Sequence, residues 1–281
     1  WKITSLSEEI NKEENFIPFI ALTETHLDSS VFDAEVHISN YNMLRSDRID
    51  RSHGGVSLYS HKDLIIDDSE VYSDKEISAA MMYNKHLNLI VAVVYRPQNT
   101  DERSFTECLN KIKTFSVHYD HADIFLTGDF NFRFIDWESE TVKSDGIPAS
   151  ERRQAQILLD FTNQNLLTQT VQENTRDKSI LDLVIVNEKD LIHSIEVTKN
   201  KYSDHCQLKV NMIHKNMFKP TSRYTHKETI PNSLDSLYML KADWQAIKQE
   251  LEEIHWDEIL KDEDNIDDVH KVFEEKVTEV C

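Results

Sequence analysis

Residues 123–131 read DIFLTGDFN, an apolar run that ends in a glycine, a carboxylate and an amide. The aliphatic and aromatic side chains of the run predict a strand over residues 123–127. In the turn that follows, Asp129 and Asn131 are expected on the same side, with Phe130 buried between them. Such a carboxylate–amide pair can orient one water or one phosphate oxygen. An Asx-rich turn with no chemical role accounts for the motif alone equally well.

Short apolar runs of this kind recur through the first two thirds of the chain and alternate with helical patterns. The alternation predicts a mixed α/β (α+β) domain. Several strand candidates follow one another with no helix between them, so the sheet must contain antiparallel pairs. The predicted strands cover residues 17–22, 56–60, 77–83, 87–95, 123–127, 180–186, 194–198 and 207–213.

Two helices are predicted between these strands. The first lies between Tyr95 and Asp123, with Asn99 and Glu102 placed as a capping pair. The second runs from about residue 150 to about residue 165. Each pattern places apolar residues on one face, so both helices are expected to pack on a sheet.

The last quarter of the chain has a different character. Hydrophobic periodicity fades around residues 214–238, and residues 219–232 are rich in Thr, Ser, Lys and Pro. We therefore predict a linker over residues 219–238. Two amphipathic stripes then predict a helical connector over residues 239–281, which would dock on the main domain or on something beyond residue 281. We therefore expect one folded domain over residues 1–218, followed by the linker and the connector.

Missing motifs exclude several classes of enzyme. The chain has only 4 glycines, which form neither a dinucleotide fingerprint nor a phosphate-binding P-loop. No G-x-S-x-G or H-E-x-x-H motif is present, which removes two common classes of hydrolase.

Three distant cysteines without C-x-x-C spacing favour a reducing, intracellular compartment over disulfides or a zinc cluster. The longest apolar run, residues 89–95, is shorter than the roughly 20 residues that a membrane span needs, so no membrane association is expected.

The formal net charge is −20, which is unusual for a protein that binds nucleic acid, because Lys and Arg side chains normally meet the phosphates. A solvated acidic surface accounts for this charge. Such a surface is compatible with a locally basic or metal-screened cleft.

Glu24 follows the apolar strand predicted at residues 17–22, in the stretch TETH at residues 23–26. A carboxylate just past a buried strand can serve as a ligand for a hard cation. A surface or capping role is the simpler interpretation of Glu24 taken alone.

Asp182 stands inside an otherwise apolar strand. An unpaired buried carboxylate is costly, so we expect Asp182 to have a partner, either a histidine or a backbone donor. The triplet SDH at residues 203–205 supplies His205 at the start of the last predicted strand. A carboxylate that holds an imidazole selects its tautomer and raises its pKa, which suits His205 for donating a proton to a phosphate. A lone histidine is more often structural or solvated.

Five short motifs occur in order at predicted strand ends: TETH (23–26), YRP (95–97), GDFN (128–131), SILDL (179–183) and SDH (203–205). Together they resemble the endonuclease/exonuclease/phosphatase superfamily. More narrowly, the chain resembles the apurinic-type endonuclease domain of non-LTR (LINE-like) retrotransposons. The stretches KADW (241–244) and IHW (254–256) are similar to the connector that leads into a reverse transcriptase in such elements.

The resemblance implies a four-layer sandwich of two packed mixed β-sheets flanked by helices, with a C-terminal helical connector. It implies a Mg2+-dependent (or Mn2+-dependent) endonuclease that hydrolyses a DNA phosphodiester and leaves a 3′-hydroxyl nick, which primes reverse transcription. It also implies a covalently linked reverse transcriptase domain beyond residue 281 and a nuclear site of action.

The resemblance also assigns roles in metal and water binding, motif by motif. Glu24 would hold the metal, with Asp204 as a further ligand. Asp129 would orient and deprotonate the attacking water, helped by Asn131, which would also contact the substrate.

Other residues would act on the phosphate. His205, held by Asp182, would stabilise charge on the phosphate. Tyr95 would contact a phosphate oxygen near the leaving group. Arg176 and Ser179 are expected to face the substrate.

The chain departs from the family pattern at its start. Members of the family begin with a strand bearing an Asn that joins the metal and phosphate site, whereas this chain opens at about the Lys that follows that strand, Lys2. We therefore expect the isolated chain to lack one core strand and to have an incomplete site.

Two other functions remain open on the sequence. The first is a phosphatase of the same superfamily acting on phosphoinositides or small phosphoesters, which the acidic composition favours slightly and the reverse-transcriptase-like tail argues against. The second is a catalytically decayed copy that serves as an interaction module. The absent first strand suggests this second reading, whereas the intact Glu24, Asp129, Asn131, Asp182 and His205 weigh against it.

Overall fold

The computed structural model describes residues 2–13, 15–47, 54–74, 76–143 and 146–213, together with residue 254. The chain divides into two units, residues 1–219 and 220–281. Apart from residue 254, the predicted linker and helical connector lie outside the described residues. Within the described part of the chain, no helix is both long enough and apolar enough to cross a membrane.

The described elements are three α-helices, thirteen strands and two short 3-10 helices. The α-helices are α1 (Lys2–Ile10), α2 (Glu102–Val117) and α3 (Ala149–Gln164). The 3-10 helices are η1 (Asp33–Val36) and η2 (Lys189–Leu191). The strands are β1 (Phe19–Thr23), β2 (Tyr41–Ser46), β3 (Val56–His61), β4 (Asp68–Ser73), β5 (Ser78–Asn84), β6 (Leu89–Tyr95), β7 (Asp123–Asp129), β8 (Ile135–Asp136), β9 (Thr141–Val142), β10 (Thr168–Gln169), β11 (Asp182–Val186), β12 (Ile192–Lys199) and β13 (Cys206–Met212).

A six-stranded sheet with the order β10-β11-β7-β6-β5-β4 forms the centre of the fold. Its two middle strands β6 and β7 run parallel, and α2 makes the crossover that a parallel pair requires. All other pairs in this sheet are antiparallel, as the uninterrupted succession of strand candidates predicts. Every residue of β5 and β6 is buried, because both faces of the sheet are covered.

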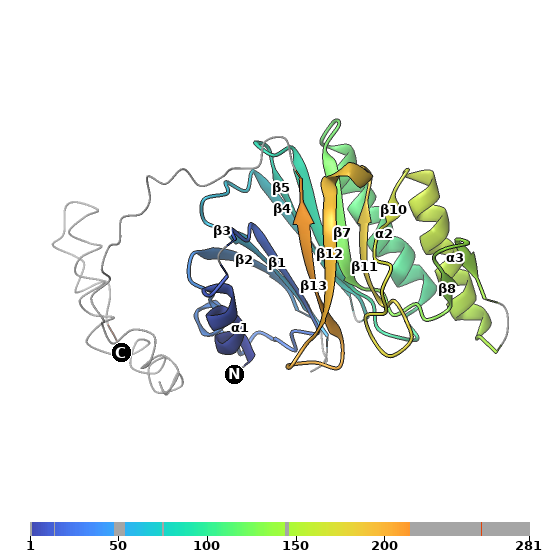
Figure 1. The fold of residues 1–281 in the computed structure, drawn as a ribbon, viewed down its shortest axis with the longest axis horizontal. Coiled ribbons are helices and arrows are strands. Elements are labelled where there is room, and N and C mark those ends of the chain that lie inside the picture. The colour runs from blue at the N-terminus through green and yellow to red at the C-terminus, as the bar shows by residue number, and fades with distance from the viewer. Residues whose placement is uncertain are drawn as a thin grey trace. The chain divides into compact units, whose positions relative to one another are not determined.

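Helices α2 and α3 cover one face of this sheet (Figure 1). The apolar face predicted for the first helix is buried on the sheet, and the start of that helix differs from the prediction. Asn99 and Glu102 do not form the capping pair. Asp101 is the N-cap, and its carboxylate accepts hydrogen bonds from the backbone N–H groups of Arg103 and Ser104. Asn99 instead has a positive φ of 60°, and its N–H donates to the carboxylate of Glu151 at 3.0 Å.

The other face of the six-stranded sheet packs against strands of two smaller antiparallel sheets. One is three-stranded with the order β1-β3-β2, and the other is the hairpin β12-β13. Helix α1 contributes Ile3, Leu6 and Ile10 to a third apolar cluster on the outer face of the three-stranded sheet. The layers therefore follow in the order α1, small sheets, large sheet, α2 and α3, which confirms the expected four-layer α+β architecture (Figure 1).

Polar contacts join the first described helix to the last described hairpin. The hydroxyl of Tyr202 donates to Glu9 at 3.1 Å, and Lys201 forms an ion pair with the same carboxylate. Lys209 of β13 donates to Glu13 at 2.7 Å, just past the end of α1. Helix α1 therefore holds the loop that leads to the triplet at residues 203–205.

Sequence patterns did not predict α1, β2, β4 and the two-residue strands. Strand β4, with the sequence DSEVYS, lies at one edge of the large sheet and is half exposed. Strand β2, with the sequence YNMLRS, lies at an edge of the small sheet. Edge strands carry polar side chains and lack a continuous apolar run, so their pairing depends on the neighbouring strand.

Candidate active site

Three polar side chains form a row across the large sheet. The parallel register of β6 and β7 sets Tyr95 opposite Asp129, and the antiparallel register of β7 and β11 sets Asp129 opposite Asp182. Residues opposite one another on paired strands lie on the same face of a sheet. Tyr95 belongs to the same buried apolar cluster as Val56 and Leu58 of β3, so this row lies on the face turned toward the small sheets.

Gly128 allows β7 to approach β6 closely at this row. Gly128 has a φ of 135°, and a Cβ atom there would lie 1.9 Å from the carbonyl oxygen of Val94. Any side chain at position 128 would therefore push β7 away from β6. The glycine thus brings Asp129 into line with Tyr95.

The Asp129 carboxylate is buried and is held by Asn131. The backbone N–H of Asn131 donates to Asp129 Oδ1 at 3.0 Å, and its side-chain amide donates to Oδ2 at 2.8 Å. Asn131 has a positive φ of 55°, a conformation that Asn adopts more readily than most residues. The structure therefore brings together the carboxylate and the amide of the GDFN motif, with Phe130 fully buried between them.

Asp182 and His205 form the pair that the sequence indicates. His205 Nδ1 lies 2.8 Å from Asp182 Oδ2, and His205 Nε2 lies 3.9 Å from Asp129 Oδ2. One imidazole thus contacts both carboxylates of the row. Burial alone would lower the pKa of His205, but the hydrogen bond and charge of Asp182, with the charge of Asp129, raise it above its ordinary value.

The pKa of Asp129 is raised to about 7. Burial is the largest cause, followed by repulsion from the negative charge of Asp182 and, more weakly, of Glu24. His205 and the N–H of Asn131 oppose the shift without cancelling it. A carboxyl group that titrates near neutral pH can act as a general base there.

Thr175 forms hydrogen bonds with the backbone beside both members of the Asp182–His205 pair. Its hydroxyl oxygen accepts hydrogen bonds from the backbone N–H groups of Leu181 at 2.9 Å and Asp182 at 3.0 Å. Its carbonyl oxygen accepts the N–H of Cys206 at 2.7 Å. The sequence analysis assigned no role to Thr175, although its neighbour Arg176 was expected to face the substrate.

Arg176 approaches the same imidazole from the other side. Its Nη1 lies 3.0 Å from His205 Nε2, and it also forms an ion pair with Asp204. A guanidinium group only donates, so Nε2 accepts here and Nδ1 carries the proton that Asp182 accepts. Ser179 is partly exposed and pairs with Arg176 through backbone hydrogen bonds in a tight turn.

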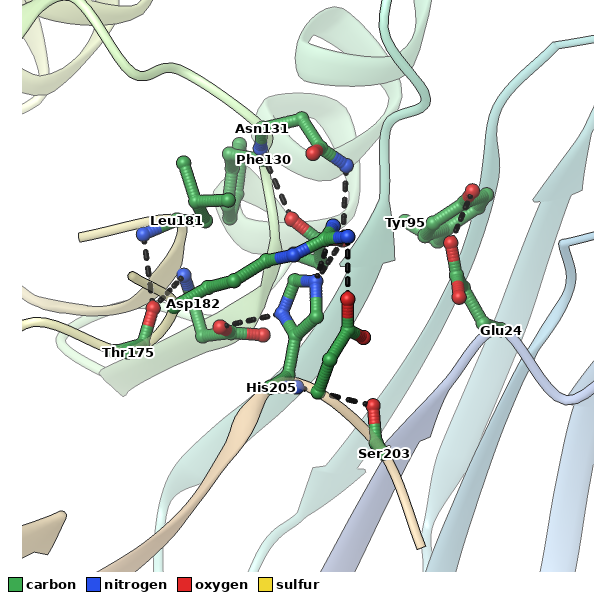
Figure 2. A network of polar contacts seen from close by, with 12 residues as sticks. Glu24, Tyr95, Phe130, Asn131, Thr175, Leu181, Asp182, Ser203 and His205 are labelled. Atoms are coloured by element: carbon green, nitrogen blue, oxygen red, sulfur yellow. Dashed lines mark hydrogen bonds and ion pairs between the residues drawn. The ribbon is translucent and has the colours of Figure 1, made fainter. Parts of the chain in front are cut away.

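Glu24 and Tyr95 meet across the two sheets. The hydroxyl of Tyr95 donates to Glu24 Oε1 at 2.7 Å, so the end of β1 reaches the row on the large sheet. Figure 2 shows this pair on one side of the site, with Asp182 and His205 on the other. Asp204 differs from Glu24, because its side chain is 66% exposed and its charge is paired with Arg176.

The acidic groups of the site suit a hard divalent cation. In the described part of the chain, ligand atoms of Asp129, Asp182 and His205 lie within 4.8 Å of one another. Nδ1 of His205 is already bound to Asp182, which leaves carboxylate oxygens as the available donors. Oxygen donors are those that Mg2+ and Mn2+ prefer. Glu24 stands outside this group, but its charge acts on Asp129.

Comparison with known proteins agrees with this architecture. Residues 89–209 match the family described as "Endonuclease-reverse transcriptase", and this segment contains the whole row and His205. No curated protein matches the chain significantly.

Among solved structures, the catalytic domain of Xenopus laevis APE2 is 14% identical, with a TM-score of 0.52 over 75% of this chain and 88% of that chain. The endonuclease domain of TRAS1, a telomere-specific non-LTR retrotransposon, is 13% identical, with a TM-score of 0.49 over 76% of this chain and 92% of that chain. A mannosyl-6-phosphatase of Bacteroides thetaiotaomicron is 12% identical, with a TM-score of 0.48 over 75% of this chain and 90% of that chain. At 14% identity the APE2 match bears on the fold alone. Residues 89–209 of the chain match the endonuclease-reverse transcriptase family, and the chain shares the fold of endonuclease/exonuclease/phosphatase proteins.

Proposed function

We propose that this chain is the metal-dependent endonuclease domain of a non-LTR retrotransposon and that it hydrolyses a DNA phosphodiester. The observation that carries the proposal is the contact of one imidazole, His205, with both Asp129 and Asp182 inside the segment that matches the endonuclease-reverse transcriptase family. Nuclear location and a reverse transcriptase domain beyond residue 281 are parts of the same proposal.

Asp129 is the general base in this proposal. Asn131 holds both oxygens of its carboxylate, and its pKa of about 7 allows it to take a proton from water near neutral pH. The attacking water is then oriented by the same carboxylate–amide pair.

His205 acts on the phosphate. Arg176 occupies Nε2 in the present arrangement, and a phosphate group would compete for this guanidinium because it offers bidentate acceptors. Release of Nε2 lets His205 become an imidazolium that donates to a phosphoryl oxygen, while Asp182 stabilises its charge. The hydroxyl of Tyr95 donates its single proton to Glu24 in the present arrangement, and with substrate bound it would turn to donate to an oxygen near the leaving group.

Glu24 is the residue that would hold Mg2+ or Mn2+. When bound, the cation would neutralise charge that develops on the phosphate. Asp204 is the weaker candidate, because Arg176 already neutralises its exposed carboxylate. The product would be a nick with a free 3′-hydroxyl, which primes reverse transcription.

The test is nicking of supercoiled plasmid by the full protein that contains residues 1–281, in Mg2+ and in EDTA. Asp129→Ala and His205→Ala should each lower the nicking rate at least about 100-fold, following the usual cost of removing such groups. Asp160→Ala is the matched control, since this carboxylate lies on the exposed face of α3. Nicking that survives in both variants would refute the assigned roles.

A phosphatase is the second candidate, and the net charge of −20 favours it because an acidic surface repels polyanionic DNA. The same proteins would be assayed with a panel of phosphoinositides and small phosphomonoesters. Metal-dependent phosphate release without nicking would select the phosphatase. If a folded, metal-loaded protein shows neither nicking nor phosphate release, the result would favour a decayed interaction module.

A further inference from the structure

Arg96 follows Tyr95 directly, and its side chain is completely buried. A buried guanidinium is costly unless it is both paired and hydrogen-bonded. Glu151 of α3 pairs with Nη2 at 3.0 Å, and Gln154 accepts from Nε at 3.0 Å and from Nη2 at 2.7 Å. Glu151 therefore neutralises the charge of Arg96, and Gln154 of the same helix adds hydrogen bonds.

Arg96 contacts each of the four consecutive residues 129–132. Its backbone N–H donates to the carbonyl of Asp129 at 2.8 Å, and its Nη1 donates to the carbonyl of Phe130 at 3.2 Å. Its own carbonyl accepts the side-chain amide of Asn131 at 3.0 Å. Its guanidinium carbon lies 4.0 Å from the centre of the Phe132 ring.

The partners of Arg96 are themselves fixed. Glu151 and Gln154 are buried, and each makes a second hydrogen bond to the loop that follows Arg96. Glu151 accepts the backbone N–H of Asn99 at 3.0 Å, and Gln154 donates to the carbonyl of Thr100 at 2.6 Å. The network therefore connects α3, this loop and the GDFN motif.

The amide of Asn131 lies between Arg96 and the catalytic carboxylate. It donates to the carbonyl of Arg96 and to Asp129 Oδ2, at 3.0 Å and 2.8 Å. A shift of Arg96 would therefore turn the amide and change the orientation of the carboxylate. Arg96 also supplies contacts on both sides of Asn131, to the carbonyl of Phe130 and to the ring of Phe132.

We propose that Arg96, with Glu151 and Gln154, is a positioning residue that orients the Asp129–Asn131 pair for attack on a phosphodiester. The proposal rests on the proposed function. Packing alone does not require a charge here, since apolar side chains of similar volume often replace a buried ion pair without loss of stability.

The decisive experiment separates stability from orientation. The double variant Arg96→Met with Glu151→Leu removes both charges and keeps the volume. We expect its melting temperature to fall only modestly, because Asn99, Phe130 and Gln154 lose hydrogen-bond partners but no buried charge is left unpaired. We expect kcat for plasmid nicking to fall at least about 10-fold, with a change in KM of less than about 2-fold. A kcat equal to that of the wild type in the folded double variant would show a purely structural role and overturn the proposal.

Arg96→Lys is the second variant, for use if the double variant does not fold. It keeps a positive charge but loses the planar fork that reaches Phe130, Glu151 and Gln154 together. We expect a fall in kcat of about 10-fold. An unchanged kcat in a folded Arg96→Lys protein would overturn the proposal. The matched control is Arg103→Met with Glu107→Leu, an exposed ion pair on α2.

A readout without turnover distinguishes the two proposals. The side-chain amide signals of Asn131 in a 15N-labelled protein should shift in Arg96→Lys and in the double variant, and should stay in place in the Arg103 and Glu107 control. Signals that do not move would overturn the positioning role even if the wild type nicks DNA. If the signals shift in the variants but the wild-type protein does not nick DNA, the endonuclease is rejected and the link between Arg96 and Asn131 is kept.

Discussion

Asp129 and Asp182 are register partners in the antiparallel pair β7–β11, and the imidazole of His205 contacts both. The carboxylates of Asp129 and Asp182 nevertheless have different environments. Asp182 binds Nδ1 at 2.8 Å, whereas Asp129 lies 3.9 Å from Nε2 and has a pKa raised to about 7. The geometry therefore separates a carboxylate that orients His205 from a carboxylate that can accept a proton.

Asp182→Asn tests the orienting carboxylate. An amide in place of the carboxylate no longer selects the Nδ1–H tautomer and no longer stabilises an imidazolium, so we expect kcat to fall about 100- to 10,000-fold. Nicking rates measured at saturating DNA check this result. Asp160→Asn should nick at the wild-type rate, and a loss of less than 3-fold in Asp182→Asn would contradict the role given to Asp182.

Asp129 should make stability depend on pH in the absence of metal. Its pKa is raised from 3.8 to about 7 in the folded chain. Between these values the folded state keeps a proton that the unfolded state releases, so the free energy of unfolding falls as pH rises from about 4 to about 7. Relative to the wild type, Asp129→Asn should gain about 1–3 kcal/mol between pH 5 and pH 8.

Urea unfolding in EDTA at several pH values measures this difference. The hydrogen bonds from Asn131 are stronger to the ionised carboxylate, and this effect is already part of the pKa of about 7. A stability difference that stays constant from pH 5 to pH 8 would disprove the raised pKa.

Thr175→Val should weaken both the fold and the site. Valine has the shape of threonine but leaves the buried N–H groups of Leu181 and Asp182 without their acceptor, which costs about 2–4 kcal/mol for the two together. Thr175→Ser keeps the acceptor and should lose about 1 kcal/mol for the missing methyl group. Urea unfolding compares the variants, and equal losses would mean that the hydroxyl has no special role.

Leu166→Gly should stabilise the protein. Leu166 follows the end of α3 with a positive φ of 53°, and its side chain is 82% exposed. Glycine adopts this conformation without the strain of a Cβ atom, and we expect the free energy of unfolding to rise by about 0.5–1 kcal/mol. Leu166→Ala keeps the strain and should gain nothing. A gain of equal size in both variants would point to the exposed leucine side chain instead of the backbone.

Apolar runs predicted the interior strands well, because burial on both faces requires them. The runs at 77–83 and 87–95 became β5 and β6 with small changes at their ends. The edge strands β2 and β4 carry no such signal, since their polar side chains suit either a strand or a loop.

The sequence predicted the part of the site in which a buried polar side chain needs a hydrogen-bond partner. A carboxylate in an apolar strand required a donor, and the structure pairs Asp182 with His205. Arg96 gave no such signal, because its partners Glu151 and Gln154 lie 55 and 58 residues away and belong to a helix whose rotation the sequence does not specify. The metal-binding roles of Glu24 and Asp204 stay predictions.

The bonds between α1 and the last hairpin have a consequence for how the protein is made. Glu9 and Tyr202 are 193 residues apart, and Glu13 and Lys209 are 196 residues apart. A ribosome adding about 5–20 residues per second needs roughly 10–40 s to deliver the second member of each pair. Closing loops of this length comes late in folding, because its entropic cost is recovered only when distant contacts form. We therefore expect a nascent chain to acquire its secondary structure well before it can hydrolyse anything.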